Sequence, residues 1–282
     1  MVKDLNTNNA PFSLTVGIQT SSPQLIQFCA LDKNKKNAWY ENIQGMVNGY
    51  REFYLSFPIA PKTLRLAIFN AGGQNPFQNE GFKIVKADIG PVKTKPIALG
   101  AQDREYLKFL YDFAKNKGEY SANTVLNSKI VPSIYGSTGG NFKFLYYNTL
   151  IDPATKKEIN TPTMVGNDTG DVSWSKTKIL PYTIPEVVAL GLHEYGHKYK
   201  NPGTGLAIGD EFGADINGLN IFRSVGFTRY PFERVFADVF AGANTPQNQQ
   251  RMVVMKKFND DFDSGKLDKY YTDFPTTKKW AA

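Results

Sequence analysis

Both histidines of this 282-residue chain lie four positions apart, in the segment His193-Glu194-Tyr195-Gly196-His197. Residues four apart share one face of an α-helix, so the two imidazoles can bind a single metal ion. Glu194 lies about 100° further round the same helix, where its carboxylate can hold a metal-bound water without ligating the metal itself. This spacing predicts a metal-dependent hydrolytic site, and the fold must supply a helix to carry it.

The residues around the motif carry the signals of a helix between about Pro185 and Lys200. Thr183 and Glu186 form a capping box, and Pro185 falls in the first turn, where no N–H is needed. Apolar residues at helical spacing supply a stripe that can be buried: Val187, Val188, Leu190, Leu192 and Tyr195. The segment Asn201-Pro202-Gly203 predicts the end of the helix.

Two glycines inside this predicted helix need an explanation. Gly191 and Gly196 each cost the helix about 1 kcal/mol relative to alanine. We therefore expect a packing reason for them, such as the close approach of another backbone.

A second helix is predicted downstream, after a short Pro/Gly loop, so the two helices should run antiparallel. Helix geometry then places Glu211 level with His197, and Asp215 level with His193. Glu211 is therefore the predicted third metal ligand. Asp215 is the predicted partner for the other ring N–H of His193. Asp210 is an alternative ligand.

The pattern His193-Glu194-x-x-His197 followed by Glu211-x-x-Ala214-Asp215 resembles the gluzincin type of zinc metallopeptidase. The resemblance implies a zincin fold, Zn²⁺ bound by His193, His197 and Glu211, and Glu194 as general base and acid in peptide hydrolysis by a metal-bound water. The spacer of thirteen residues between His197 and Glu211 is shorter than in thermolysin-like members. The chain has no third histidine, so another residue type must stabilise the oxyanion, and the candidates are Tyr182, Tyr199, Arg223, Arg229 and Tyr230.

Residues 1–95 have the pattern of an all-β domain. Short alternating or apolar runs are separated by turn residues, at Phe12–Thr20, Gln24–Leu31, Tyr50–Phe57, Thr63–Phe69 and Phe82–Asp88. No helical pattern separates these runs, which favours a sandwich or a barrel. The domain is either a docking module for a protein assembly partner or a cover for the rest of the chain.

Residues 96–282 are the predicted metallopeptidase domain, which makes the expected fold class α+β. The resemblance implies a zincin-like domain with a small sheet, an active-site helix and C-terminal helices. The corresponding patterns are a helix over 103–117, strands over 123–131 and 141–150, and helices over 231–241 and 246–262. In peptidases of this kind the strand before the metal helix is a sheet edge. We therefore expect a peptide or protein substrate to add to Val172–Lys176 as an extra strand.

Composition limits the function classes. The net charge is +7, with 11 Lys and Arg against 6 Asp and Glu in residues 1–100, but without a basic stripe nucleic-acid binding is not favoured. No apolar run approaches a membrane span, the N-terminus has no signal-peptide core, and the chain has one cysteine. These features favour a cytoplasmic or virion-associated protein over one secreted by a signal peptide.

A second resemblance gives an alternative function. Residues 120–200 resemble the zincin-like domains of tailed-bacteriophage virion proteins in general sequence character more than in any motif. This implies a structural or assembly component of a virion, in the tail or connector region, that carries the domain whether or not it is active.

Overall fold

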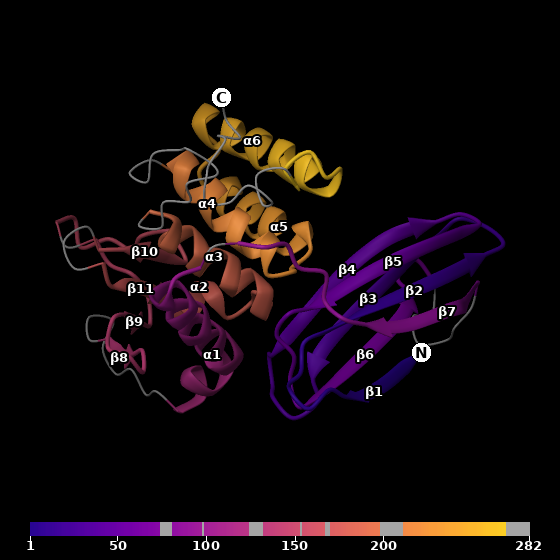
Figure 1. Cartoon of the computed structure of the whole chain (residues 1–282). Coiled ribbons are helices and arrows are strands. Elements are labelled where there is room, and N and C mark those ends of the chain that lie inside the picture. The colour runs from indigo at the N-terminus through magenta and orange to yellow at the C-terminus, as the bar shows by residue number, and fades with distance from the viewer. Residues whose placement is uncertain are drawn as a thin grey trace. The chain divides into compact units, whose positions relative to one another are not determined.

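The structure, a computed structural model, describes residues 1–73, 81–97, 99–123, 132–152, 154–166, 170–197 and 211–268. These residues form a mixed α+β protein with several sheets and six helices, which confirms the coarse fold class (Figure 1). The chain divides into two compact units. The first comprises Met1–Thr94 and Val225–Thr228, and the second comprises Lys95–Ser224 and Arg229–Ala282.

The first unit contains strands in two antiparallel sheets. The strands are β1 (Val2–Asn6), β2 (Phe12–Thr20), β3 (Gln24–Asp32), β4 (Trp39–Val47), β5 (Tyr50–Phe57), β6 (Thr63–Asn70) and β7 (Phe82–Gly90). One sheet has the order β1-β6-β3-β4 and the other β5-β2-β7. The sheets meet through Phe28 and Phe53, whose ring centroids lie 4.6 Å apart. Sequence patterning missed β1 and β4 because many of their side chains are exposed and do not alternate regularly.

The segment Val225–Thr228 belongs to the first unit although it lies far along the chain. Gly226 has a φ of +104°, and a Cβ there would clash with the side chain of Val92. Its carbonyl accepts a buried hydrogen bond of 2.6 Å from Oγ of Ser56, and Phe227 is buried. The conformation and the close packing together require glycine at this position.

The second unit contains a mixed sheet and all six described helices. Its elements are α1 (Ala101–Asn123), β8 (Ser133–Gly136), β9 (Lys143–Tyr147), β10 (Thr163–Val165), β11 (Val172–Ser175), α2 (Lys176–Ile179), α3 (Ile184–Gly196), α4 (Glu211–Ser224), α5 (Arg229–Ala241) and α6 (Pro246–Asp263). Phe113 of α1 packs on the sheet, with ring centroids 5.0 Å from Phe144 and 4.9 Å from Trp174. The strand expected over 123–131 falls outside the described residues except for Asn123, which ends α1.

The sheet order corrects one prediction. The order is β10-β11-β9-β8, so Val172–Ser175 is an interior strand and Val172–Lys176 is not the edge. β11 pairs in parallel with β9 and antiparallel with β10. Among the described strands, the two edges are Thr163–Val165 and Ser133–Gly136, and Thr163–Val165 is the edge next to β11. Three residues preceded by a proline carry too little alternation to be recognised as a strand from sequence.

Helix α3 begins where the sequence predicts it but ends earlier than expected. Thr183 and Glu186 make a reciprocal capping box, and every residue from Ile184 to Gly196 is buried. His197 is the C-cap residue, so the helix ends within the motif, and the predicted stop at 201–203 lies outside the described residues. A helix buried on all sides is held in place by its packing.

Helices α3 and α4 pack backbone to backbone through glycine. A Cβ on Gly196 would clash with the carbonyl of Ala214, and one on Gly218 would lie 2.5 Å from the carbonyl oxygen of Leu192. The close backbone approach expected at Gly196 is therefore confirmed. At Gly191 the neighbour is instead the side chain of Leu110.

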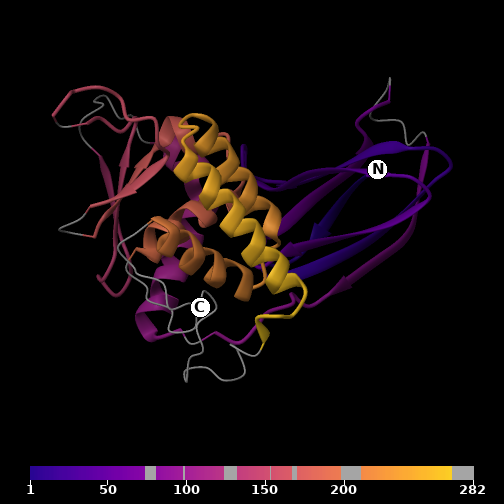
Figure 2. The ribbon, with the colours of Figure 1, turned by 90° about the horizontal axis from the view of Figure 1, so that it is seen from above.

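Helices α5 and α6 complete the second unit. α5 packs on α3, and α6 packs on both α4 and α5, as Figure 2 shows for the yellow helix. None of the described helices is both long and apolar enough to cross a membrane.

Candidate metal centre

Three of the residues predicted as ligands lie together in the structure. His193 and His197 come from the end of α3, and Glu211 is the first residue of α4. Oε2 of Glu211 lies 3.4 Å from Nε2 of His193, and its Oε1 lies 3.8 Å from Nε2 of His197. One ligand atom from each residue falls within 4.8 Å of the others, so the group could hold a metal ion. The alternative ligand Asp210 lies outside the described residues.

The donor set fits a borderline divalent metal. Two imidazole nitrogens and one carboxylate oxygen are ligands that zinc accepts, and they leave a coordination position free. The three side chains are partly shielded, with exposed fractions of 9% for His193, 19% for His197 and 46% for Glu211. The most exposed of these side chains faces both histidines, as expected of a group that meets a shared ion.

Asp215 contacts the other side of His193. Its Oδ1 lies 2.9 Å from Nδ1 of His193, and its side chain is 1% exposed. A carboxylate at this position fixes which imidazole nitrogen carries the proton and leaves Nε2 free to ligate.

Arg251 of α6 is a site residue that the sequence did not reveal. Its Nε and Nη2 donate to Asp215 at 2.6 and 2.9 Å, and Nη2 also lies 2.9 Å from Oε2 of Glu211. Its guanidinium stacks on Phe240, 4.5 Å from the ring centroid. The residue lies 36 positions after Asp215 in a polar segment without a motif, so no local signal distinguishes it from a surface arginine.

The charges of this cluster shift the pKa values in opposite directions. Burial alone would lower the pKa of His193, but Asp215 and Glu211 raise it to about 10. The contact with His193 lowers the pKa of Glu211 to about 2, with Arg251 adding to the effect. The site is therefore arranged to hold positive charge between two carboxylates.

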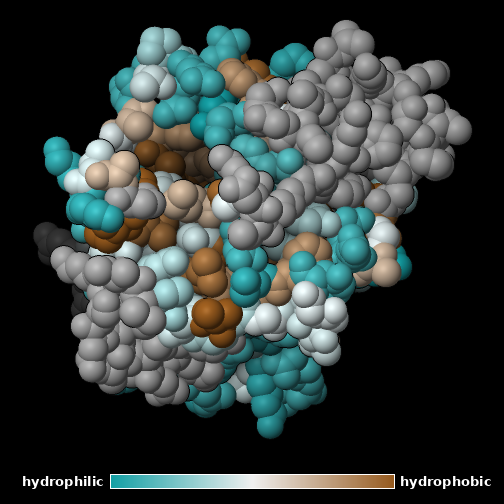
Figure 3. Space-filling model, turned by 90° about the vertical axis from the view of Figure 1, so that its left-hand side faces the viewer, coloured by the Kyte–Doolittle hydropathy of each residue, from teal (hydrophilic) through white to brown (hydrophobic). Residues whose placement is uncertain are grey.

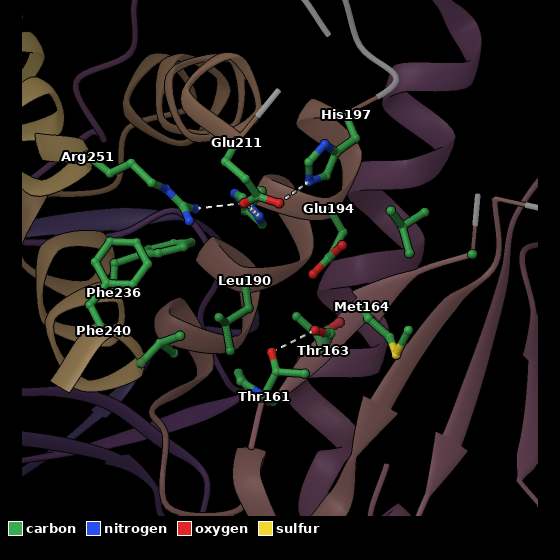
Figure 4. Close-up of a pocket in the computed structure, with 15 residues that line it drawn as sticks. Thr161, Thr163, Met164, Leu190, Glu194, His197, Glu211, Phe236, Phe240 and Arg251 are labelled. Atoms are coloured by element: carbon green, nitrogen blue, oxygen red, sulfur yellow. Dashed lines mark hydrogen bonds and ion pairs between the residues drawn. The ribbon is translucent and has the colours of Figure 1, made fainter. Parts of the chain in front are cut away.

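Glu194 lies beside the cluster and points into the pocket (Figure 4). Burial raises its pKa to about 7, although His193 opposes the shift. The backbone of Val165, on strand β10, also opposes the rise in the pKa of Glu194. A carboxylate with this pKa can both accept and return a proton near neutral pH.

A cavity of about 570 Å³ opens over these groups. One wall is the segment 161–166 that contains β10, the floor is α3, and the opposite wall is formed by α5 with Phe236, Val239 and Phe240. Figure 3 shows hydrophobic side chains grouped beside a recess in the surface. The cavity offers an apolar side and a polar, metal-ligating side next to each other.

The four described candidates for oxyanion stabilisation do not line the cavity. Tyr182 donates to Asp238 at 2.5 Å, Arg223 bonds Asp263, Arg229 pairs with Glu233, and Tyr230 is 49% exposed. None of these four lines the cavity, and Tyr199 lies outside the described residues. Among the described lining residues, Arg251 is the one lysine or arginine.

No family model, curated protein or solved structure matches this chain at a significant level.

Proposed function

We propose that the second unit is a zinc-dependent peptide hydrolase with a zincin-like arrangement, and that the first unit is an accessory β domain. The observation that supports it is the placement of His193, His197 and Glu211 around one point, with Glu194 directed into the same cavity. His193, His197 and Glu211 are the proposed ligands. When bound, zinc supplies a Lewis acid and lowers the pKa of a water molecule that it coordinates.

Glu194 is the proposed general base. Its carboxylate lies on the helix face next to the histidines, and it takes the proton from the attacking water. It then returns the proton to the amine that leaves. Asp215 keeps His193 in the tautomer that ligates, and Arg251 holds Asp215 with two hydrogen bonds.

We propose that the main chain of the substrate pairs with the edge strand β10. Pro162 and Gly166 direct backbone groups to β11, through bonds with Ser175 and Asp171. Along an antiparallel strand, the backbone N–H and C=O groups of successive residues point alternately toward the paired strand and away from it. The backbone groups of Thr163 and Val165 therefore point away from β11. The backbone N–H groups of Thr163 and Val165 are the proposed positions for pairing with a peptide.

A comparison of variants at Glu194 tests the proposal. Glu194→Gln keeps the size of the side chain and leaves the three ligands in place, so the protein should retain bound zinc. Its rate of peptide hydrolysis should fall by about a hundredfold or more, measured on a peptide library by mass spectrometry. Glu105→Gln, in the same unit and outside the cavity, is the matched control and should stay active. Equal activity of wild type and Glu194→Gln would overturn the proposed mechanism.

A further inference from the structure

Helix α3 packs against α1, α4 and α5, and its contacts with α1 and α4 use different residues. On one side, Gly196 and the carbonyl of Leu192 meet α4. On another, Gly191 and Tyr195 meet α1. The pocket side carries His193, Glu194 and His197 together with Leu190. The orientation of α3 therefore depends on α1 and α4, together with α5.

Tyr106 supplies a polar and a ring contact from α1, beside the apolar contact that Leu110 makes with Gly191. Its hydroxyl donates a buried hydrogen bond of 2.6 Å to the carbonyl oxygen of Gly191. Its ring stacks on Tyr195 with centroids 4.2 Å apart and planes 14° apart. The hydroxyl of Tyr195 in turn bonds Asp103, also on α1. Tyr106 is 1% exposed, so these contacts are shielded from water.

The helical positions separate the base from the ligands. Gly191 lies about 60° from Glu194 around the helix, whereas the two histidines lie about 120° or more from the same position. His193 is also held by Asp215, and Glu211 is held by Arg251. A local shift of the helix backbone at Gly191 should therefore displace Glu194 more than the ligands, because the ligands have these additional contacts.

We infer that Tyr106 is a positioning residue that sets the direction of the Glu194 carboxylate. Its hydroxyl acts through the Gly191 carbonyl and its ring acts through Tyr195. The inference rests on the proposed function insofar as Glu194 is the base, and it goes further because it assigns α1 a part in the reaction.

Tyr106→Phe removes the hydroxyl and keeps the ring stack. In the zinc-loaded protein we expect kcat to fall at least about tenfold, with KM and the zinc Kd within about twofold of wild type, because a displaced base slows only the chemical step. Phe113→Leu is the matched control. It lies on the same helix and is buried, but it packs on the sheet. It should lose stability without this change in kcat.

A second readout needs neither metal nor activity. In metal-free protein labelled with ¹³C at the glutamate carboxyl groups, the Glu194 resonance is assigned by its loss in Glu194→Gln. It should shift in Tyr106→Phe and stay in place in Phe113→Leu. An unmoved resonance in Tyr106→Phe, or a kcat no lower than that of Phe113→Leu, would overturn the inference. A wild type that hydrolyses no peptide would refute the proposed function, and the resonance would still decide the role of Tyr106.

Discussion

At the residue scale, the buried Asp215 lies between two positively charged partners and holds both of them in place. It accepts two hydrogen bonds from Arg251 and contacts His193 at 2.9 Å. Arg251→Leu should lower the free energy of unfolding of the metal-free protein by about 3 kcal/mol, because it leaves a buried carboxylate short of its partner. Arg251→Lys should recover only part of the lost free energy of unfolding, since lysine lacks the planar guanidinium that donates two hydrogen bonds to one carboxylate. Arg229→Leu is the control, because Arg229 is more exposed, at 22%, and pairs with carboxylates outside the cavity; the expected loss is about 1 kcal/mol in urea unfolding. Equal losses in both variants would contradict this account.

The pKa of His193 gives a second prediction at this scale. Because this pKa is about 10 in the metal-free protein, the imidazole carries a proton at neutral pH that a metal must displace. Zinc binding should therefore release at least about one proton, and the zinc Kd should fall about tenfold per pH unit between about pH 7 and 9. Calorimetry in two buffers of different ionisation enthalpy measures the release. A Kd that is independent of pH would show that His193 is already neutral.

At the scale of elements, the approach of α3 and α4 sets the distance between the histidines and Glu211. Gly218→Ala places a methyl group against the backbone of Leu192, so it should cost about 3 kcal/mol of stability and weaken zinc binding. Gly191→Ala is the matched control, because the neighbour there is the flexible end of Leu110, which can move. Thermal unfolding and zinc titration of both variants check the prediction. A Gly218→Ala protein that binds zinc as wild type does would show that the helices need not be this close.

Strand β10 is the element that we expect to pair with the substrate. Thr163→Pro removes the N–H that faces away from β11, and should raise KM for peptides several-fold with a smaller effect on kcat. Thr163→Val keeps the N–H and loses the hydroxyl bond to Ser173, so it serves as the control. Steady-state kinetics on one peptide would separate the two. An equal KM in both variants would exclude pairing at Thr163.

The elements of the site differ in how far local sequence could predict them. The capping box of Thr183 and Glu186 and the four-residue spacing of the histidines are local, and both predicted α3. The register of Glu211 and Asp215 followed from helix geometry alone. The edge position of Thr163–Val165 and the role of Arg251 depend on pairing between distant segments. Such pairing leaves no periodic pattern in the sequence, and a three-residue strand is too short to show one.

At the scale of the whole molecule, the first unit is made from two stretches of chain. Val225–Thr228 belongs to it, with Phe227 buried and Gly226 bonded to Ser56. A chain that begins at Lys95 leaves Phe227 without this cover. We expect it to unfold at lower temperature than the full chain and to bind a hydrophobic dye, and Phe227→Gln in the truncated chain should reduce the dye binding. Unfolding at the same temperature as the full chain would show that the segment does not need the β strands.

The metal content of the purified protein is the measurement on which the account depends most directly. Mass spectrometry of wild type and Glu211→Ala, side by side after dialysis against zinc, reports the ligand set without reference to activity. Glu233→Ala, on α5 and outside the cavity, controls for the loss of a carboxylate. The account predicts one zinc ion per chain in wild type and Glu233→Ala, and its loss in Glu211→Ala. A wild type without zinc, or a Glu211→Ala variant that keeps it, would contradict the proposed centre.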